Sequence, residues 1–508
     1  CALLRHLLVR SRGFMGLLGR RACVIGRVCC PGVWLGGAHR GLSTGSAGAM
    51  VRAVNPASGE AFGETYKPTS AQELSGMLER ARRAQKDWAA VGLRERAATL
   101  LRFNVLLREQ REELASLLSK EMGKPVSHAA GELSATAARV QWLVESAHEV
   151  LEPRTVGTFG GVKEVVEYEP LGVVANISAW NYPWFVASNV FAAALVTGNA
   201  VLFKPSEYTP NTGDAVKRLL LEAGVPEDVF LTAQGGASTG AALAGLPGLR
   251  GVFFTGSYAT GCAVGSAAGN ILARTQLELG GKDPVYVRAD ADISKAAEAV
   301  ADGSMFNAGQ SCCGVERVYV AREIAAPFSE AFVEAVKSMR QGDPSSTETY
   351  MGPQTRAAAL PHLRGQVDDA IAQGARLMYR GDVSTLDPRG NWFPRTVLSG
   401  AHHGMQIMQE ESFGPVVGLQ EVSGDAEALS LMADTSYGLT AGVYSSDEEA
   451  ALGLLRELDV GSGYINCCDR VSPRLPWSGR GHSGVGATLG LEGLRAFVQT
   501  KALHVRTK

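Results

Sequence analysis

Cys312 is the residue of this sequence whose type and setting point most directly to chemistry. It belongs to residues 306–313, which read FNAGQSCC, and it stands between a helix-like stretch and the apolar run 317–320. This position predicts a thiol exposed where a strand begins, as a nucleophilic cysteine requires. Taken alone, the motif fits a buried core cysteine equally well, so its meaning depends on the residues that accompany it.

A carboxylate in an apolar setting is the second chemical feature. Glu278 lies in residues 276–282, which read QLELGGK, and burying a carboxylate there is costly unless it has a partner or a task. Asn181 places an amide beside aromatic residues in the segment 179–183, AWNYP. Three further segments combine polar side chains with strand ends or turns: residues 204–207, KPSE; residues 254–261, FTGSYATG; and residues 410–415, EESFGP.

These six segments, in this order and at these separations, resemble the aldehyde dehydrogenase superfamily. The resemblance runs from about Asn55 to about Lys501. Each motif is only moderately specific, but the match of all six in register identifies the family. The resemblance implies oxidation of a small aldehyde to a carboxylate, with NAD⁺ as cofactor and NADP⁺ as a possible alternative.

The resemblance also assigns three catalytic residues. Cys312 matches the nucleophile, which forms a thiohemiacetal and then a thioester. The side-chain amide of Asn181 and the backbone N–H of Cys312 would hold the developing oxyanion. Glu278 matches the general base that activates water to hydrolyse the thioester, and its apolar neighbours are expected to raise its pKa toward neutrality.

The cofactor residues follow partly from physics and partly from the resemblance. Gly256 and Gly261 flank a turn at a helix start, where backbone N–H groups and the helix dipole favour a pyrophosphate. The resemblance places Ser257 at the pyrophosphate, Lys204 and Glu207 at the adenosine ribose, and further residues nearby. The full cofactor set that it implies is Trp180, Lys204, Ser206, Glu207, Gly256, Ser257, Gly261, Leu279, Glu411 and Phe413. No metal is expected, because metal ligands are usually about two to four residues apart and the cysteine pairs are adjacent.

The substrate is less well specified. Succinic-semialdehyde dehydrogenases carry an arginine eight positions after the oxyanion asparagine, and here that position is Asn189, which disfavours a carboxylate-bearing aldehyde. Tyr182, Phe306 and Trp477 fall on positions that form a cation cage in aminoaldehyde and betaine-aldehyde dehydrogenases. The same aromatic residues equally make an apolar tunnel for neutral aldehydes, which is the slightly preferred interpretation.

Two rival functions remain open. One is a CoA-acylating semialdehyde dehydrogenase, although such relatives generally lack the base that Glu278 provides. The other is a non-catalytic structural or binding protein on the same fold, although Cys312, Asn181, Glu278 and Glu411 are all intact. Cys313, Cys467, Cys468 and the pair His402-His403 are interpreted as structural or solvated residues.

Hydrophobic periodicity predicts the elements that hold these residues. Buried strands are expected at 171–177, 200–203, 251–254 and 284–287, and helices at 94–122, 210–223, 294–306 and 326–337. Ser70 and Glu73 have the spacing of a capping box. Alternating strands and helices predict an α/β fold with parallel sheets. The resemblance further implies a Rossmann-type cofactor domain, an α/β catalytic domain and a small β extension for oligomerisation.

The expected boundaries are 51–150 with 171–279 for the cofactor domain and 280–483 for the catalytic domain. Residues 151–170 and 484–508 would form the extension. Unpaired strands there need a partner, so a homodimer or homotetramer is expected.

Charge separates the first fifty residues from the rest. They contain seven Arg, no Lys and no acidic residue, which predicts a mitochondrial targeting leader over residues 1–50 and a matrix location. The whole chain of 508 residues has a formal net charge of −2, which gives no indication of nucleic-acid binding. Polar residues interrupt the uncharged stretch between Glu169 and Lys204, so no membrane span is expected.

Overall fold

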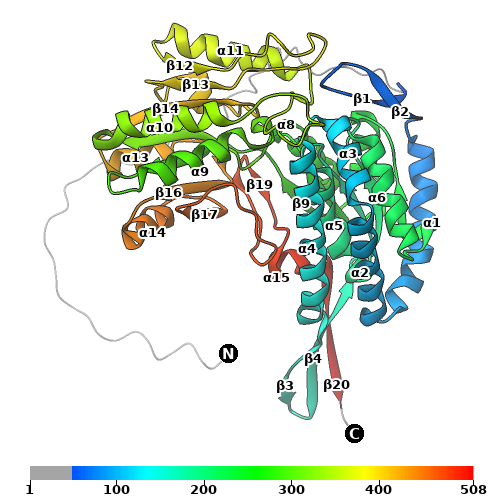
Figure 1. Cartoon of the computed structure of the whole chain (residues 1–508). Coiled ribbons are helices and arrows are strands. Elements are labelled where there is room, and N and C mark those ends of the chain that lie inside the picture. Colours follow the sequence, from blue (N-terminus) through cyan, green and yellow to red (C-terminus); the bar gives the residue numbers. More distant parts are fainter. Residues whose placement is uncertain (1–48, 507–508) are drawn as a thin grey trace, which may run out of the picture. The chain divides into compact units, whose positions relative to one another are not determined.

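The computed structural model of this protein describes residues 49–506. The expected leader over residues 1–50 lies outside the described residues, apart from its last two positions. Within the described part of the chain, no helix is both long and apolar enough to cross a membrane. The structure is organised around two large sheets, each flanked by helices and each with its own hydrophobic core (Figure 1).

The first large sheet has six strands in the order β19-β9-β8-β5-β6-β7. Its strands are β5 (Val173–Ile177), β6 (Ala200–Lys204), β7 (Phe230–Thr232), β8 (Gly251–Thr255), β9 (Arg274–Glu278) and β19 (Gly484–Val485). All neighbours pair in parallel except β19, which runs antiparallel to β9. The central strands β5 and β6 are buried throughout, as expected for a parallel sheet covered on both faces.

The second large sheet has seven strands in the order β12-β13-β14-β11-β10-β16-β17. These are β10 (Asp283–Val287), β11 (Val315–Ala321), β12 (Arg376–Arg380), β13 (Thr396–Ser399), β14 (Val416–Val422), β16 (Thr440–Tyr444) and β17 (Ser462–Ile465). Only the edge strand β12 is antiparallel to its neighbour. The four strands predicted from apolar runs are β5, β6, β8 and β10, so those predictions are confirmed to within two residues.

Helices surround both sheets. Around the six-stranded sheet they are α1 (Ala71–Ala90), α2 (Leu93–Glu109), α3 (Arg111–Met122), α4 (Val126–Leu151), α5 (Pro183–Val196), α6 (Pro210–Glu222), α7 (Ala237–Ala244), α8 (Tyr258–Asn270) and α15 (Gly490–Arg495). Those that follow β10 in the chain are α9 (Ile293–Met305), α10 (Ala325–Ser338), α11 (Ala359–Ala372), α12 (Gln406–Gln409), α13 (Asp425–Ala433) and α14 (Glu448–Glu457). Single 3₁₀ turns lie at Glu227–Val229, Phe306–Gly309 and Arg322–Ile324.

The helices expected at 210–223, 294–306 and 326–337 are α6, α9 and α10, so those predictions are confirmed to within one residue. The capping box is present: the Ser70 side chain accepts from the Glu73 N–H, and the Glu73 carboxylate accepts from the Ser70 N–H. The single helix expected over 94–122 is wrong, because the chain breaks at Gln110 into α2 and α3. The 26-residue helix α4 was not predicted, since charged residues punctuate its apolar face.

A three-stranded antiparallel sheet carries the chain end. Its order is β20-β4-β3, built from β3 (Arg154–Phe159), β4 (Val162–Pro170) and β20 (Val498–Arg506). Figure 1 shows these strands extending beyond the helices as a long ribbon. Two small antiparallel pairs complete the fold: β1 (Val51–Val54) with β2 (Ala61–Tyr66), and β15 (Tyr437–Gly438) with β18 (Arg480–Gly481).

Candidate active site

The carboxyl edge of the six-stranded sheet gathers three of the predicted segments. Because β5, β8 and β9 are parallel, the residues after them emerge at one edge. Trp180 and Asn181 follow β5, Gly256 and Ser257 follow β8, and Glu278 ends β9. The chain order reverses direction at β5, and ligands of open α/β sheets bind at such switch points.

The amino edge of the seven-stranded sheet supplies the other side. Strands β10, β11 and β14 are parallel neighbours, so the loops that enter them lie together. Gly281 precedes β10, Cys312 precedes β11 and Glu411 precedes β14. The Asn181 amide donates to the Gln310 carbonyl at 3.1 Å, which joins the two edges directly.

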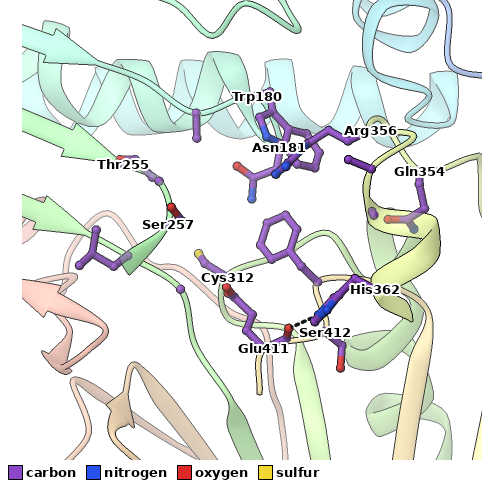
Figure 2. Close-up of a pocket in the computed structure, with 17 residues that line it drawn as sticks. Trp180, Asn181, Thr255, Ser257, Cys312, Gln354, Arg356, His362, Glu411 and Ser412 are labelled. Atoms are coloured by element: carbon purple, nitrogen blue, oxygen red, sulfur yellow. Dashed lines mark hydrogen bonds between the residues drawn. The ribbon is translucent and has the colours of Figure 1, made fainter. Parts of the chain in front are cut away.

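Two cavities meet at Cys312. One of about 310 Å³ is lined by residues that include Trp180, Ser257, Glu411 and Phe413 (Figure 2). The other, of about 380 Å³, is lined by aromatic and polar residues of α4, α5 and the segment 469–477. Asn181, Thr255 and Cys312 line both cavities, so a molecule in either one reaches the same thiol.

The loop before Cys312 is held in an unusual backbone conformation. Asn307, Ala308 and Gly309 have φ values of 54°, 56° and 70°, and the first two are residues for which such angles are strained. Gly309 is required, because a Cβ there would collide with the backbone of Gly414. The conformation turns the chain sharply between α9 and β11 and leaves Cys312 half-buried at the junction of the cavities.

The two glycines of the QLELGGK motif allow close packing around the thiol. A Cβ on Gly281 would collide with the Cys312 carbonyl oxygen, and one on Gly280 would collide with the Glu411 carboxylate. Glu411 accepts a hydrogen bond from the Gly281 N–H at 3.0 Å. Burial and the nearby Glu316 raise the pKa of Glu411 to about 8.

Asn181 is locked in place by buried neighbours. Its backbone carbonyl oxygen accepts from the Lys124 ammonium at 2.9 Å and from the Asn307 side-chain amide at 3.2 Å. The side chain is 4% exposed, and Figure 2 shows it directed into the same space as the Cys312 thiol. An amide donor fixed beside a thiol in this way is suited to stabilise an oxyanion.

Glu278 lines the second cavity at the end of β9. Its carboxylate accepts from the hydroxyl of Thr488 and, at 3.4 Å, from that of Thr255. Burial raises the pKa of Glu278, while the Thr488 hydrogen bond and the nearby Arg139 act in the opposite direction. The direction agrees with the expectation from the sequence, and it keeps a base near the thiol that is not permanently ionised.

The first cavity has the features that a dinucleotide needs. Ser257 is the N-cap of the 13-residue helix α8, and the cavity lies at that helix end. The rings of Trp180 and Phe413 meet edge to face with centroids 5.6 Å apart. The His362 ring nitrogen lies 2.9 Å from the Glu411 carbonyl oxygen and holds that loop (Figure 2).

Four of the predicted cofactor residues do not line this cavity. Lys204 ends β6, where its ammonium lies 3.5 Å from the Glu207 carboxylate and 2.9 Å from the Pro205 carbonyl oxygen. Ser206 is buried in the same turn. Gly261 lets α8 approach Leu279, whose side chain would collide with a Cβ at that position. Leu279, Gly256 and Ser257 do line the cavity.

The three predicted substrate residues all line the second cavity. The Lys124 ammonium lies 3.8 Å from the centre of the Tyr182 ring, and His128 stacks on Phe306 with centroids 4.3 Å apart. Trp477 is 5% exposed. Two of the three ring faces therefore already have a partner, and the arrangement is closer to a lined tunnel than to an open aromatic cage.

Several residues of the site were missed from the sequence. Lys124 and Glu132 form a buried ion pair between the start of α4 and its second turn, and Glu132 also accepts from the N–H groups of Trp184 and Phe185. Gln354, Arg356 and His362 line the first cavity, and His128 and Arg139 line the second. The sequence feature that could have revealed some of them is the presence of charged residues inside the apolar pattern of 126–151.

The residues interpreted as structural or solvated can also be compared with the structure. His402 is exposed as expected, but the solvated interpretation is wrong for His403, whose side chain is 16% exposed and contacts Tyr319 and Asp434. Cys313 is buried, and its thiol donates to Asp469 at 2.9 Å. In residues 49–506 no group of three His, Cys, Asp or Glu side chains is placed to hold a metal ion.

Comparison with known proteins identifies the family of this chain. Residues 43–503 match the model of the aldehyde dehydrogenase family. Lactaldehyde dehydrogenase from Escherichia coli is 32% identical with a TM-score of 0.87, over 91% of this chain and 96% of that protein. An NAD-dependent aldehyde dehydrogenase from Sinorhizobium meliloti is 33% identical with a TM-score of 0.87, over 90% of this chain and 92% of the other. An NADP-dependent enzyme from E. coli is 29% identical with the same TM-score, over 90% and 95%. The fold class expected from the sequence is thereby confirmed, and the chain belongs to the aldehyde dehydrogenase family of oxidoreductases.

Proposed function

We propose that this protein oxidises an aldehyde to a carboxylate with NAD⁺, or alternatively NADP⁺, by way of a thioester on Cys312. The observation that carries the proposal is the meeting of two cavities at this thiol. One cavity presents a helix N-terminus and a buried carboxylate, and the other presents Glu278 among aromatic residues. Cofactor and aldehyde can thus reach the same sulfur from different sides.

The residues of the first cavity fit a nicotinamide dinucleotide. The N–H groups of α8 behind Ser257 suit a pyrophosphate, and the Glu411 carboxylate suits a ribose hydroxyl. Glu207 beside β6 would favour NAD⁺ by repelling a 2′-phosphate, while Lys204 weakens that preference. When bound, the nicotinamide supplies the acceptor for a hydride.

The first half of the reaction uses Cys312 and Asn181. The sulfur of Cys312, as the thiolate, bonds to the aldehyde carbon, and the carbonyl oxygen becomes an oxyanion. The Asn181 amide and the Cys312 N–H donate to that oxygen; removing such a donor typically costs about a hundred- to a thousandfold in rate. Loss of hydride from the same carbon then leaves a thioester on Cys312.

The second half uses Glu278. As a carboxylate it takes a proton from water, and the hydroxide oxygen bonds to the thioester carbon while the bond to sulfur breaks. The thiolate of Cys312 is regenerated and the acid is released. A base buried in a cavity that also admits the aldehyde supports hydrolysis over acyl transfer to CoA, the second candidate.

The test is the absorbance of reduced nicotinamide with purified protein, an aldehyde panel, NAD⁺ or NADP⁺, and Cys312→Ser as the control. Reduction that depends on Cys312 and proceeds without CoA is expected. Reduction only with CoA would favour the acylating alternative. Cofactor binding with no reduction for any aldehyde would favour a non-catalytic role.

We also propose that the chain acts in the mitochondrial matrix as a homodimer or homotetramer. The arginine-rich, acid-free composition of residues 1–50 supports the location. The three-stranded sheet supports the assembly, because its two outer strands, β20 and β3, each have an unpaired edge in the described chain. The test of the location is import of the full chain into isolated mitochondria. Import that does not depend on the membrane potential would contradict the matrix location.

A further inference from the structure

Arg139 places a guanidinium in the cavity that receives the aldehyde. It lies on the face of α4 that lines this cavity together with His128, Glu132 and Ala135. The residue is 2% exposed, so its charge is almost completely removed from water. A buried charge is costly unless other groups compensate for it.

The compensation present in the structure is incomplete. Nη1 of Arg139 donates to the Asn189 side-chain oxygen at 2.8 Å, Nη2 donates to the Val471 carbonyl at 3.2 Å, and the group stacks over the Phe185 ring. A guanidinium has about five N–H donors, so donors remain. In residues 49–506 no carboxylate lies within ion-pair distance of it.

The buried cations Lys124, Lys282 and Arg317 have more complete sets of partners than Arg139. Lys124 is paired with Glu132, and Lys282 is paired with Glu316. Arg317 has no acid partner, but it donates to three backbone carbonyls and the Tyr319 hydroxyl. Arg139 has no anion within ion-pair distance and lines an open cavity; Glu278 and Glu132 attract it only through space. Burial lowers its pKa to about 9, which still leaves it charged at neutral pH.

The acidic groups that line the cavity have other partners. Glu132 is paired with Lys124, and Asp469 accepts from the Cys313 thiol and the Ser311 hydroxyl. Glu278 is bound by Thr488 and Thr255. Each therefore leaves the Arg139 guanidinium available to an incoming anion.

Arg139 stands at a distance from the thiol that suits the far end of a substrate. Asn189, which anchors it, lies on α5, six residues after Pro183 where that helix begins, or about 9 Å along the helix at 1.5 Å per residue; Asn181 comes two residues before Pro183. Tyr182, Phe185 and Val186 line the space between them. The aldehyde would bind at Asn181 and Cys312, and its other end would reach the guanidinium.

We infer that Arg139 recognises a carboxylate at the end of the substrate opposite the aldehyde, so that the preferred substrates are semialdehydes of dicarboxylic acids. This inference rests on the proposed function. A planar guanidinium binds two carboxylate oxygens at once. At the level of the sequence, Asn189 disfavours such substrates because there is no arginine at that position, but the structure brings one to the Asn189 amide from α4. A cationic aminoaldehyde would instead be repelled.

The test compares matched aldehydes on the wild-type protein. The semialdehydes of succinate, glutarate and adipate are paired with the n-alkanals and aminoaldehydes of equal chain length, and kcat/KM is measured for each. For at least one length, the acid is expected to exceed the alkanal by about a hundredfold, the effect of a hydrogen-bonded charge pair. No preference for any acid, with the alkanals oxidised, would overturn the inference and leave the proposed function intact. Oxidation of no aldehyde would overturn both.

Variants then locate the recognition. Arg139→Gln is expected to lower the acid-to-alkanal ratio of kcat/KM by about a hundredfold. Arg470→Gln removes a charge from the exposed rim of the same cavity, where solvent screens it, and should change the ratio by less than about threefold. An Arg139 that acted only on the pKa of Glu278 would affect acid and alkanal alike and leave the ratio unchanged, which would overturn the inference.

Arg139→Lys covers the case in which the glutamine variant does not fold. An ammonium keeps the charge but cannot bind both carboxylate oxygens, so the ratio should fall below that of the wild type. A ratio equal to or above the wild-type value would overturn the inference.

Discussion

At the scale of single residues, the site depends on neighbouring groups that set the protonation state of a few side chains. Glu278 is the clearest case, because burial and hydrogen bonding act on it in opposite directions. Burial favours the neutral acid, whereas the Thr488 hydroxyl favours the carboxylate. The general base works only when ionised, so activity should fall as the pH drops through the raised pKa of Glu278.

Thr488→Val should move that acid limb to higher pH. Loss of the hydroxyl removes a hydrogen bond to the charged form, and one such bond corresponds to roughly one pH unit. Thr255→Val should shift the limb less, because its hydroxyl lies farther away at 3.4 Å. The measurement is kcat against pH for both variants and the wild type. An acid limb that stays in place in Thr488→Val would contradict the role of Glu278 as base.

At the scale of elements, α4 connects the start of the site to its far end. Lys124, just before the helix, holds Asn181, and Glu132 in its second turn accepts from the first N–H groups of α5. Eleven residues along the helix from His128, Arg139 reaches the region of Asn189. One helix thereby positions the proposed oxyanion donor Asn181, the start of α5 and the guanidinium.

Lys124→Met should destabilise the protein strongly. The substitution leaves Glu132 as an unpaired buried carboxylate, and breaking a buried pair costs about 3–5 kcal/mol of unfolding free energy. Lys86→Met, on the exposed surface of α1, should change it by less than about 0.5 kcal/mol. Denaturant unfolding of both variants provides the comparison. Equal stabilities would show that the Lys124–Glu132 pair does not support the fold.

At the scale of the whole molecule, the three-stranded sheet carries the exposed apolar surface expected of an interface. Val156, Phe159 and Val505 on its strands are 48%, 60% and 44% exposed. Phe159 and Val505 lie on opposite faces of the sheet, since Val505 is in register with Thr158 through Lys163. Exposed large apolar side chains on strands with unpaired edges favour association. The proposed homo-oligomer would cover them.

Phe159→Glu should therefore weaken self-association. Exposing or charging one buried phenylalanine costs about 1.5–3 kcal/mol, or at least about tenfold in the dissociation constant. Ile371→Glu is the matched control, since Ile371 on α11 is 43% exposed and lies away from these strands. Sedimentation velocity across a concentration series measures both. A wild-type protein that stays monomeric at micromolar concentration would contradict the proposed assembly.

The sequence by itself determined local features, such as the positions of buried strands, and those features that the motifs carry, such as the family. Apolar runs located β5, β6, β8 and β10, because a strand buried on both faces has a continuous apolar pattern. Six motifs in register identified the family, and the apolar setting of Glu278 predicted the direction of its pKa shift. Gln110 carried no breaking signal strong enough to separate α2 from α3.

Only the tertiary structure decided which distant residues share one cavity. Arg139 and Asn189 are fifty residues apart in the chain, and Glu278 and Thr488 are 210 apart, yet each pair is hydrogen-bonded. Such pairings arise when helices and strands pack, and local periodicity holds no information on them. The residue at position 189 therefore did not reveal the charge in the proposed substrate cavity, because the guanidinium comes from a different helix.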